Sequence, residues 1–493
     1  MCYNMNKIVF NHSYVLKHDR KRTYIIASEN SVGSNCIKGW VSKIHPIYAM
    51  ILSFLSTPCT EQEAIDKISS FLEVAVDDAE KILSLFIRSK KPFTTEYHAV
   101  NSVFPGNLIV NADSEQVYSK IYYPQQFAYE DIDVAQQRCY VSPIGLVFMV
   151  NNVCATNCIY CYADKYTKST MLSLQEVEKM CLEAKKLGIE SMAISGGEVF
   201  MYPEWYSLLR ILIKYGYKPN LISTKYPLSE YDIRRLKSLE IKLQVSLDAF
   251  DSSTLSGLLN VNFEYFTKIK QTIFLLDQYE MNFQVATVIT NRNCSISNLN
   301  SLFTFLSSLK FLSRWEIRIA FRSLYSRDDF NSIKVTKEQI QSIDNWVREK
   351  ILCSSMNILW SPENGRKYFQ AEHGSPTFSG SRCSANFSHM VVLPDGKVTI
   401  CEQLYWNPQF IIGDIKKQNI AEIWNSSKAL YLAHVPQIDV RSSSVCSSCK
   451  LYDLCLDYPN KCYADVLKAY GRDNWDYPDP RCNQAPKFIY DMY

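Results

Sequence analysis

The sequence lacks the features of an exported or membrane-spanning protein. Residues 1–8 contain no basic stretch followed by an apolar one, as a secretory signal would. No part of the 493-residue chain is long and apolar enough to cross a bilayer. The chain contains 17 cysteines, and without an export signal these favour metal binding over disulfide bonds. We therefore expect a cytoplasmic protein that does not bind membranes.

Several common functional motifs are also absent. The chain has no Walker loop, no catalytic-triad motif, no heptad run and no convincing dinucleotide-binding fingerprint. Its seven histidines show no paired spacing that would indicate a metal site. The formal net charge of +3 is too small to favour binding to nucleic acid. The length corresponds to roughly three domains of typical size.

Three closely spaced cysteines are the most informative feature that is present. Cys154, Cys158 and Cys161 form a CxxxCxxC array directly after residues 145–150, an apolar run that predicts a buried strand. Thiolates this close on one loop suit a soft metal or an iron–sulfur cluster. Three ligands cannot complete a four-iron cube, so one iron would stay open to a substrate or cofactor. The alternative is a zinc site with a distant fourth ligand, although zinc sites favour CxxC pairs.

The region after this array alternates between strand-like and helix-like segments. Further strand-like runs lie at residues 191–195, 220–224, 242–247, 283–289 and 315–321. Helical patterns lie at residues 173–186, 203–214, 230–239, 263–279, 296–309 and 337–350. Six strand–helix repeats predict an α/β fold with a parallel sheet curled into a partial barrel, and an open doubly wound sheet is the alternative. In such a barrel, functional residues gather at the C-terminal ends of the strands.

Small and polar residues follow the next strand ends. They are Gly196, Gly197, Glu198, Ser223, Ser246 and Asp248. The paired glycines would let a backbone approach a ligand closely. The serines and the aspartate could bind a ribose and a carboxylate, or they could simply cap the following helices.

The cysteine array resembles the signature of the radical S-adenosylmethionine (SAM) enzymes, including the aromatic Tyr160 before the third cysteine. In that family, the three cysteines hold a 4Fe–4S cluster, and SAM binds the open iron through its amino and carboxylate groups. Reductive cleavage of SAM then gives methionine and a 5′-deoxyadenosyl radical, which takes a hydrogen atom from the substrate. The resemblance implies that Cys154, Cys158 and Cys161 bind the cluster and that Tyr160 lies against the adenine.

The resemblance extends to the SAM-binding residues. Residues 196–198 are similar to the family's GGE motif, whose backbone and glutamate hold the amino group of SAM, although Val199 replaces the usual proline. Many relatives have an arginine beyond the fourth strand that pairs with the SAM carboxylate, and this chain has none there. Either Arg318 or Arg322 takes that role, or the contact is lost.

A second cysteine set occupies the C-terminal third. It comprises Cys383, Cys401, Cys446, Cys449, Cys455, Cys462 and Cys482. With Gly396, the spacing resembles the SPASM domain, which holds up to two auxiliary 4Fe–4S clusters. The gap from Cys455 to Cys462 is longer than usual, and Pro459 and Asn460 in this gap suggest a looped insertion.

The SPASM resemblance implies two ligand sets. The outer cluster would be completed by Cys446, Cys449, Cys455 and Cys482. The inner cluster, nearer the barrel, would be held by Cys383, Cys401 and Cys462. No fourth cysteine is obvious for the inner cluster, so its last iron is either open or bound by another group. A zinc ribbon is the alternative for the CxxC pair alone.

The first 100 residues predict a separate module. Strand-like runs and helical patterns follow one another at residues 14–18, 21–27, 45–55, 60–71 and 76–87. This order resembles the RiPP recognition element, a winged-helix-like peptide-binding domain fused to many peptide-modifying radical SAM enzymes. Such domains bind the leader of a precursor peptide by adding it as an extra strand. A DNA-binding winged helix is the alternative, although no helix here is rich in Lys or Arg.

The resemblances together imply a domain order and a function. The expected domains are a leader-binding module (1–100), an irregular linker (101–140), the partial barrel (141–352) and the SPASM domain (353–493). The chain would abstract hydrogen from a ribosomally made precursor peptide and form a thioether or carbon–carbon cross-link. Its cofactors would be three 4Fe–4S clusters and SAM, and its partners the precursor peptide and a reductant such as flavodoxin or ferredoxin.

Two other functions remain open. Sulfatase-type maturases, which oxidise Cys or Ser to formylglycine, have an aspartate base right after the second SPASM cysteine, and here Glu402 takes that position as the candidate catalytic base. The chain could also be a non-catalytic iron–sulfur electron-transfer protein, although such a protein would need no GGE motif.

Overall fold

The computed structural model describes residues 7–28, 37–112, 120–325, 330–361, 382–458 and 461–492. The chain forms two compact units, Met1–Ile144 and Gly145–Tyr493. Pro459 and Asn460, expected to lie in a looped insertion, fall outside the described residues. No helix within the described ranges has both the length and the apolar character that crossing a bilayer requires.

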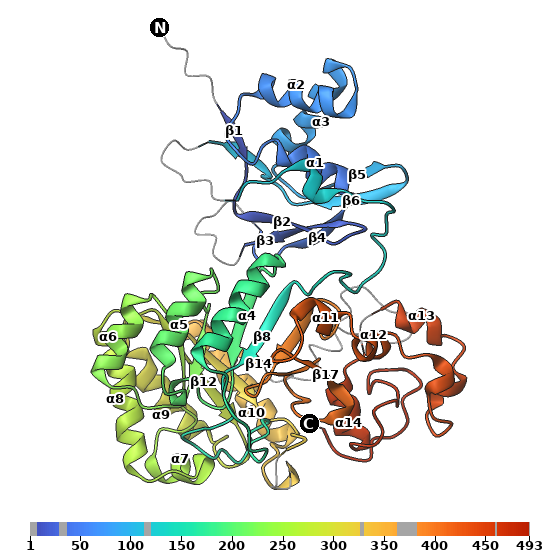
Figure 1. Ribbon diagram of the computed structural model, residues 1–493. Coiled ribbons are helices and arrows are strands. Elements are labelled where there is room, and N and C mark those ends of the chain that lie inside the picture. The colour runs from blue at the N-terminus through green and yellow to red at the C-terminus, as the bar shows by residue number, and fades with distance from the viewer. Residues whose placement is uncertain are drawn as a thin grey trace. The chain divides into compact units, whose positions relative to one another are not determined.

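The N-terminal unit combines antiparallel strands with three helices (Figure 1). Its strands are β1 (Ile8–Phe10), β2 (Tyr14–His18), β3 (Thr23–Ala27), β4 (Val41–Ile44), β5 (Phe93–Tyr97), β6 (Val100–Phe104) and β7 (Ile109–Asn111). Its helices are α1 (Pro46–Ser53), α2 (Glu61–Leu72) and α3 (Val76–Arg88). The three helices match the predicted ones, and α2 begins at a capping box formed by Thr60 and Glu63. Strands β2, β3 and β4 form one antiparallel sheet with β4 at its edge, and β5 and β6 form a hairpin.

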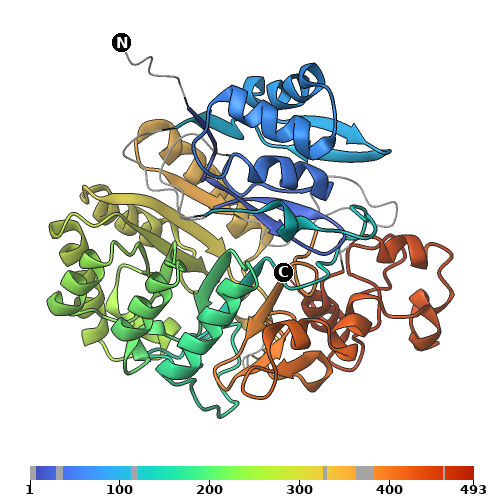
Figure 2. The ribbon, with the colours of Figure 1, turned by 45° about the horizontal axis from the view of Figure 1, so that its top comes forward.

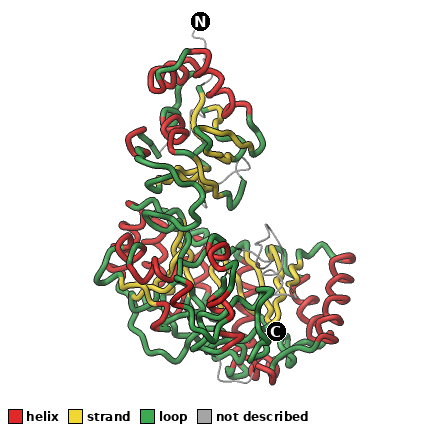
Figure 3. Tube along the Cα trace, turned by 90° about the vertical axis from the view of Figure 1, so that its right-hand side faces the viewer, coloured by secondary structure: helices red, strands yellow, loops and turns green. Residues whose placement is uncertain are grey.

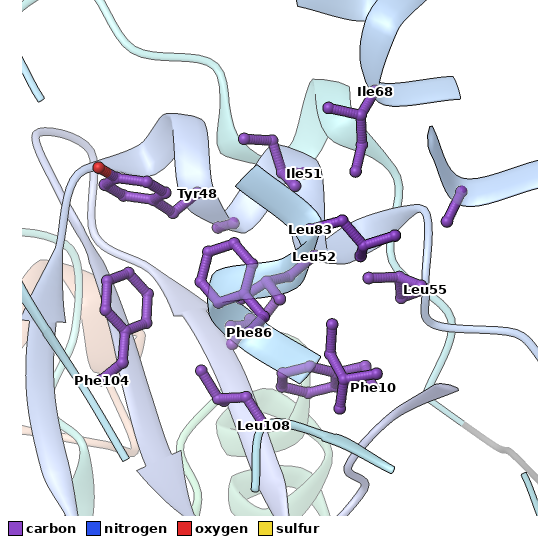
Figure 4. Packing of buried hydrophobic residues seen from close by; sticks show 14 of the residues in the cluster. Phe10, Tyr48, Ile51, Leu52, Leu55, Ile68, Leu83, Phe86, Phe104 and Leu108 are labelled. Atoms are coloured by element: carbon purple, nitrogen blue, oxygen red, sulfur yellow. The ribbon is translucent and has the colours of Figure 1, made fainter. Parts of the chain in front are cut away.

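The prediction that residues 101–140 form an irregular linker is wrong for the first part of that segment. Strand β7 pairs with β1 near the start of the chain, and β6 completes the hairpin with β5. Phe104 and Leu108 are fully buried in the same core as Phe10 and Phe86 (Figure 4). These strands are short, and one of them pairs with a partner about a hundred residues away, so local periodicity does not reveal them.

The later part of that segment is held by a buried arginine. The guanidinium of Arg22 is fully buried and pairs with Asp19 at 3.0 Å. It also donates hydrogen bonds to the backbone carbonyls of Gln136 and Arg138. A buried cation needs such partners, because water cannot solvate it. Residues 136–138 are therefore fixed to the N-terminal unit, which runs on to Ile144.

The C-terminal unit begins with the predicted alternation of strands and helices. Its first strands are β8 (Gly145–Met149), β9 (Ser191–Ser195), β10 (Ile222–Thr224), β11 (Leu243–Ser246), β12 (Phe283–Ile289), β13 (Leu312–Ile319) and β14 (Ile358–Ser361). The helices among them are α4 (Leu174–Lys186), α5 (Trp205–Lys214), α6 (Glu230–Ser238), α7 (Ser252–Leu259), α8 (Glu264–Gln278), α9 (Ile296–Ser307) and α10 (Lys337–Cys353).

The strands form the predicted partial barrel. Strands β10 to β14 pair in parallel in chain order, β8 pairs in parallel with β9, and β9 contacts β10. Figure 2 shows the barrel helices along the outside of this curved sheet. The α/β partial-barrel prediction is therefore confirmed, with α7 and β14 as additional elements.

The cysteine-rich part is fused to the barrel through a shared sheet. Its elements are β15 (His389–Val392), β16 (Lys397–Thr399), β17 (Ile411–Asp414), α11 (Ile420–Trp424), α12 (Ser427–Ala433), α13 (Tyr452–Leu456) and α14 (Tyr463–Tyr470). Strand β15 pairs in parallel with β8, and β16 and β17 continue the sheet in antiparallel fashion. Long stretches of loop connect these short elements (Figure 3).

Candidate cluster-binding and SAM-binding site

The first cysteine set lies on the loop after β8, and the backbone of this loop packs on the glycine pair after β9. The amide of Gly197 donates to the carbonyl of Asn151 at 2.8 Å, and the amide of Glu198 donates to that of Val153 at 2.7 Å. A Cβ atom on Gly197 would lie 2.2 Å from the Val153 carbonyl oxygen, which no structure tolerates. Gly197 is therefore required because the backbone of the cysteine loop passes too close to it to leave room for a side chain.

Asn151 also holds the cysteine loop against the turn after β9, and the sequence analysis did not predict this role. Its side chain is fully buried and donates to the carbonyl of Glu198 at 2.7 Å. Its Oδ1 atom accepts from the amides of Val153 and Glu198, each at 3.2 Å. A lone asparagine after a strand has no motif of its own, so the sequence does not single it out.

The thiols of the first set lie in a partly buried environment. The Thr156 hydroxyl lies 3.5 Å from the Cys154 sulfur and 3.3 Å from that of Cys158. Burial raises the pKa of Cys158 to about 11, and the Lys225 cation opposes this rise. Burial also raises the pKa of Cys161. Thiolates at such buried positions require a bound cation to be stable, as a cluster would provide.

Asp248 organises the side chains next to this loop. It is fully buried, and Oδ2 accepts the Tyr160 hydroxyl and the Lys225 ammonium, the latter at 3.2 Å. Its Oδ1 accepts the amide of Val288 at 2.7 Å. The Lys225 ammonium also lies 5.6 Å from the centre of the Tyr160 ring. Asp248, expected to contact SAM, thus holds Tyr160 in position, and Lys225 is a partner that sequence reasoning missed.

The Glu198 carboxylate is buried and already accepts three hydrogen bonds from the protein. Its carboxylate accepts the Thr224 hydroxyl at 2.9 Å, the Lys225 amide at 2.9 Å and the Phe200 amide at 3.3 Å. Burial raises the pKa of Glu198, and these three donors oppose the rise. A carboxylate has about four acceptor positions, so one remains for a ligand amino group.

The other predicted SAM contacts lie on three strands. Ser223 on β10 accepts from the Gln244 amide at 2.9 Å, and Ser246 is buried at the end of β11. Arg318 on β13 donates to Glu316 at 2.8 Å, and its side chain is 43% exposed. Its guanidinium is therefore accessible to an anion. Arg322 stacks on Tyr490, with 4.2 Å between the guanidinium carbon and the ring centre.

Tyr162 directly follows Cys161 and lies within electrostatic range of Glu402 and Arg318. Its ring stacks on Phe321, with 5.9 Å between the ring centres. Burial raises the pKa of Tyr162, and the charge of Glu402 raises it further. The charge of Arg318 lowers the same pKa. The structure therefore brings Glu402 and Arg318 to one residue that directly follows Cys161.

The seven C-terminal cysteines form two groups. Burial raises the pKa of Cys401 to about 12, and the charge of Cys383 raises it further. Beyond burial, Cys383 and Cys401 raise the pKa of Cys462 in the same way, so these three thiols lie together. In the other group, burial raises the pKa of Cys446, and the charges of Cys455 and Cys482 raise it further. Burial likewise raises the pKa of Cys482, and the charge of Cys449 adds to this rise. The two groups have the same members as the sets that the SPASM resemblance implied, and their role as cluster ligands stays a prediction.

Backbone amides lie close to several of these sulfurs. The amide of Gln484 donates to the sulfur of Cys482 at 3.4 Å. In three further cases, burial raises the pKa of the thiol and the amide two residues further along the chain opposes the rise. The pairs are Cys161 with Ala163, Cys383 with Ala385 and Cys401 with Gln403. Amide donors stabilise thiolates and are a feature of iron–sulfur sites, so the donor set fits the clusters.

The cysteine sets do not have the arrangement of a single-ion site. In the described ranges, no three His, Cys, Asp or Glu side chains come together as the ligands of one metal ion would.

Two family models match the parts of the chain that contain these cysteines. Residues 149–290 match the radical SAM superfamily, and residues 383–450 match SPASM, an iron–sulfur cluster-binding domain. The chain is also 28% identical over 113 residues to a probable GTP 3′,8-cyclase of Methanothermobacter thermautotrophicus. This match covers 22% of the present chain and 37% of that relative.

Solved structures resemble the chain over nearly its whole length. Streptococcus suis SuiB bound to S-adenosylmethionine superposes with a TM-score of 0.61 at 14% identity, covering 96% of this chain and 100% of SuiB. SuiB bound to precursor peptide SuiA superposes with a TM-score of 0.64 at 14% identity, covering 97% and 100%. At this identity, the likeness establishes the fold. Residues 149–290 therefore form a radical SAM domain and residues 383–450 a SPASM domain, and these two domains imply 4Fe–4S clusters and SAM as cofactors.

Proposed function

We propose that the chain is a leader-dependent enzyme that forms a thioether or carbon–carbon cross-link in a ribosomally made precursor peptide. The order of its parts carries this proposal: an N-terminal unit of strands, three helices and a hairpin precedes the barrel and the SPASM domain. The same order extends over the whole of SuiB, which has been solved with a precursor peptide bound.

The N-terminal unit would bind the leader. Strand β4 forms the edge of the three-stranded sheet, and Val41 on it is 51% exposed. An edge strand offers backbone hydrogen bonds to an added strand, and an exposed apolar side chain beside it supplies a contact for the peptide.

The barrel would hold the first cluster and SAM. Cys154, Cys158 and Cys161 would bind the cluster, and the backbone around residues 196–198 would hold SAM beside Tyr160. When bound there, SAM supplies a 5′-deoxyadenosyl radical that removes a hydrogen atom from the peptide. The protein's part is positioning: Asp248 and Lys225 fix Tyr160, and Glu198 keeps one acceptor position for the amino group.

The region near Tyr162 would complete the reaction. Bond formation between a carbon radical and a thiol or C–H group releases one proton and one electron. Glu402 directly follows Cys401 and lies within electrostatic range of Tyr162, which supports the proposal that Glu402 would accept the proton. Cys383, Cys401 and Cys462 would hold the inner auxiliary cluster, the acceptor of the electron.

The test is an anaerobic assay with a candidate precursor peptide, chosen from any short reading frame that adjoins the gene. With SAM and a reductant, the product should lose a pair of hydrogens per cross-link, measured by mass spectrometry. Conversion of Cys or Ser to formylglycine would instead favour a sulfatase-type maturase. Reductive cleavage of SAM with an unchanged peptide would contradict the peptide proposal, and a protein that binds only zinc would contradict the cluster assignment.

A further inference from the structure

The inner cysteine set has three members, whereas a four-iron cluster has four irons to ligate. Cys383 precedes β15, Cys401 follows β16, and Cys462 precedes α14. The question is which group binds the fourth iron.

Asp465 occupies the position from which a fourth ligand can come. Cys462 is the N-cap residue of α14, and its side chain makes no capping hydrogen bond. Asp465 lies three residues later in the first helical turn, and side chains at this spacing lie on the same face of a helix. The Asp465 side chain is buried, with the residue only 6% exposed. A carboxylate at such a position requires a cation close by.

The carboxylate of Asp465 has spare acceptor capacity, unlike other buried carboxylates of this unit. Within the described residues, its hydrogen bond is a long one of 3.5 Å from the Lys468 ammonium. In contrast, Asp479 accepts the Cys462 amide at 2.8 Å and the Arg481 guanidinium at 2.6 and 2.7 Å. Asp248 similarly accepts three hydrogen bonds. Asp465 is therefore a buried carboxylate with one ion-pair partner, the Lys468 ammonium at 3.5 Å, and with acceptor positions left over.

The charge of Asp465 acts on the thiols of the inner set. Burial raises the pKa of Cys462 well above its usual range, and the next largest cause is the negative charge of Asp465. The same charge adds to the burial that raises the pKa of Cys383. The carboxylate thus lies within electrostatic range of two of the three thiols.

The Lys468 ammonium joins the Asp465 carboxylate to Gln403. Its ammonium is buried and donates to Gln403 Oε1 at 2.6 Å, and it lies 4.5 Å from the centre of the Phe321 ring. Gln403 in turn lies two residues after Cys401 in the chain. Asp465 is thereby tied to the same small region as the thiols.

We propose that the Asp465 carboxylate is the fourth ligand of the inner auxiliary cluster, bound to the iron that Cys383, Cys401 and Cys462 leave open. This inference rests on the proposed cluster assignment. A carboxylate oxygen is a harder and weaker ligand for iron than a thiolate. The iron it binds is therefore the one that an incoming substrate thiolate can reach by displacing it, with Lys468 available to pair with the released carboxylate.

The test compares three variants in a full-length background that lacks the SAM cluster because Cys154, Cys158 and Cys161 are changed to Ala. Asp465→Ala should alter the electron paramagnetic resonance spectrum of the reduced inner cluster. On mild oxidation, this variant should lose one of the four irons of that cluster and give a 3Fe–4S signal. Asp465→Cys should keep all four irons and shift the reduction potential. Lys468→Met should retain the parental spectrum and iron content.

Two outcomes would overturn the assignment. If Asp465→Ala and Asp465→Cys both leave the spectrum and the iron content unchanged, Asp465 is not a ligand. If Lys468→Met reproduces the effects of Asp465→Ala, the carboxylate acts only through the ion pair. A parental protein that assembles no inner cluster would instead contradict the proposed cluster assignment. The spectrum of the outer cluster reports in each variant whether the SPASM domain is folded.

Discussion

At the scale of single residues, buried polar side chains fix the cysteine loop of the barrel. Asn151 joins the loop to the turn after β9, and Asp248 joins it to β10 and β12 through Lys225 and Val288. Each makes several hydrogen bonds while almost fully buried. Polar networks of this kind give a loop one conformation, because any alternative would leave buried groups unpaired.

Asp248→Ala should destabilise the C-terminal unit by about 3–5 kcal/mol, because it leaves the Lys225 ammonium buried without its anion. Asp251→Ala is the matched control, since Asp251 is exposed and caps α7 through the Thr254 amide at 2.7 Å. Loss of that cap should cost about 1 kcal/mol. Urea unfolding of the two variants measures both values, and equal losses would contradict the role of Asp248 as the counter-ion of the buried Lys225 ammonium.

Gly197→Ala should prevent assembly of the SAM cluster. Its Cβ would meet the Val153 carbonyl at 2.2 Å, so the cysteine loop must move. Iron content after anaerobic reconstitution should fall by one cluster. Gly257→Ala in α7 is the control, because nothing lies within 4 Å of its added Cβ. That variant should keep every cluster and gain about 0.5–1 kcal/mol of helix stability. Full iron content in Gly197→Ala would contradict the close packing.

At the scale of secondary-structure elements, α1 depends on an unusual cap. His45 precedes the helix, and its Nδ1 atom accepts the Ile47 amide at 3.1 Å. The rings of Tyr97 and Tyr129 each lie 5.0 Å from the imidazole in edge contact. Such a cap works only while the ring is neutral, because a protonated Nδ1 cannot accept a hydrogen bond.

Acid should therefore weaken α1. Burial lowers the pKa of His45 to about 4, and His98 adds to the effect. The neutral ring contributes stability that is complete above pH 6.5, the usual pKa, and is lost as the pH falls toward 4. The loss should reach about 2 kcal/mol at pH 5. Hydrogen exchange of α1 in wild type and in His45→Asn, compared at each pH, measures it. Asparagine also caps helices, so the variant should show no such loss.

At the scale of the whole molecule, the chain consists of two units with a boundary near residue 144. We propose that the N-terminal unit binds the peptide and that the C-terminal unit is catalytic. The boundary matters for experiments, because residues 101–112 belong to the N-terminal unit. A cut at residue 100 would leave Phe104 and Leu108 without the core that buries them. Exposed apolar segments of this kind promote aggregation.

Deletion of residues 1–142 should therefore give a soluble protein that cleaves SAM reductively but does not modify the full precursor. Deletion of residues 1–100 should give an aggregating protein, because β6 and β7 lose their partners. Size-exclusion chromatography and an assay for 5′-deoxyadenosine check the behaviour of the two truncated proteins. Normal modification of the precursor by the shorter protein would contradict the recognition role of the N-terminal unit.

The sequence predicts this architecture best where the signal is local. The CxxxCxxC array, the capping boxes and the repeated strands and helices each lie within one short stretch, so their positions follow from spacing alone. Asn151, Lys225 and Asp465 have no such signature, since their roles arise from neighbours distant in the chain. The pairing of β15 with β8 joins segments more than two hundred residues apart for the same reason.

The pairing of β15 with β8 limits which barrels and which SPASM domains can be combined in one chain. Strand β15 lies beside β8, with His389 opposite Gly145, and the Gly145 amide donates to the Ser388 carbonyl at 3.2 Å. A chimera joined between the barrel and the cysteine-rich part would remove a strand from the catalytic sheet and expose its edge. A transplanted SPASM domain must therefore bring a strand that complements its new host. Recombination among these proteins is then restricted to pairs whose sheets have matching edges.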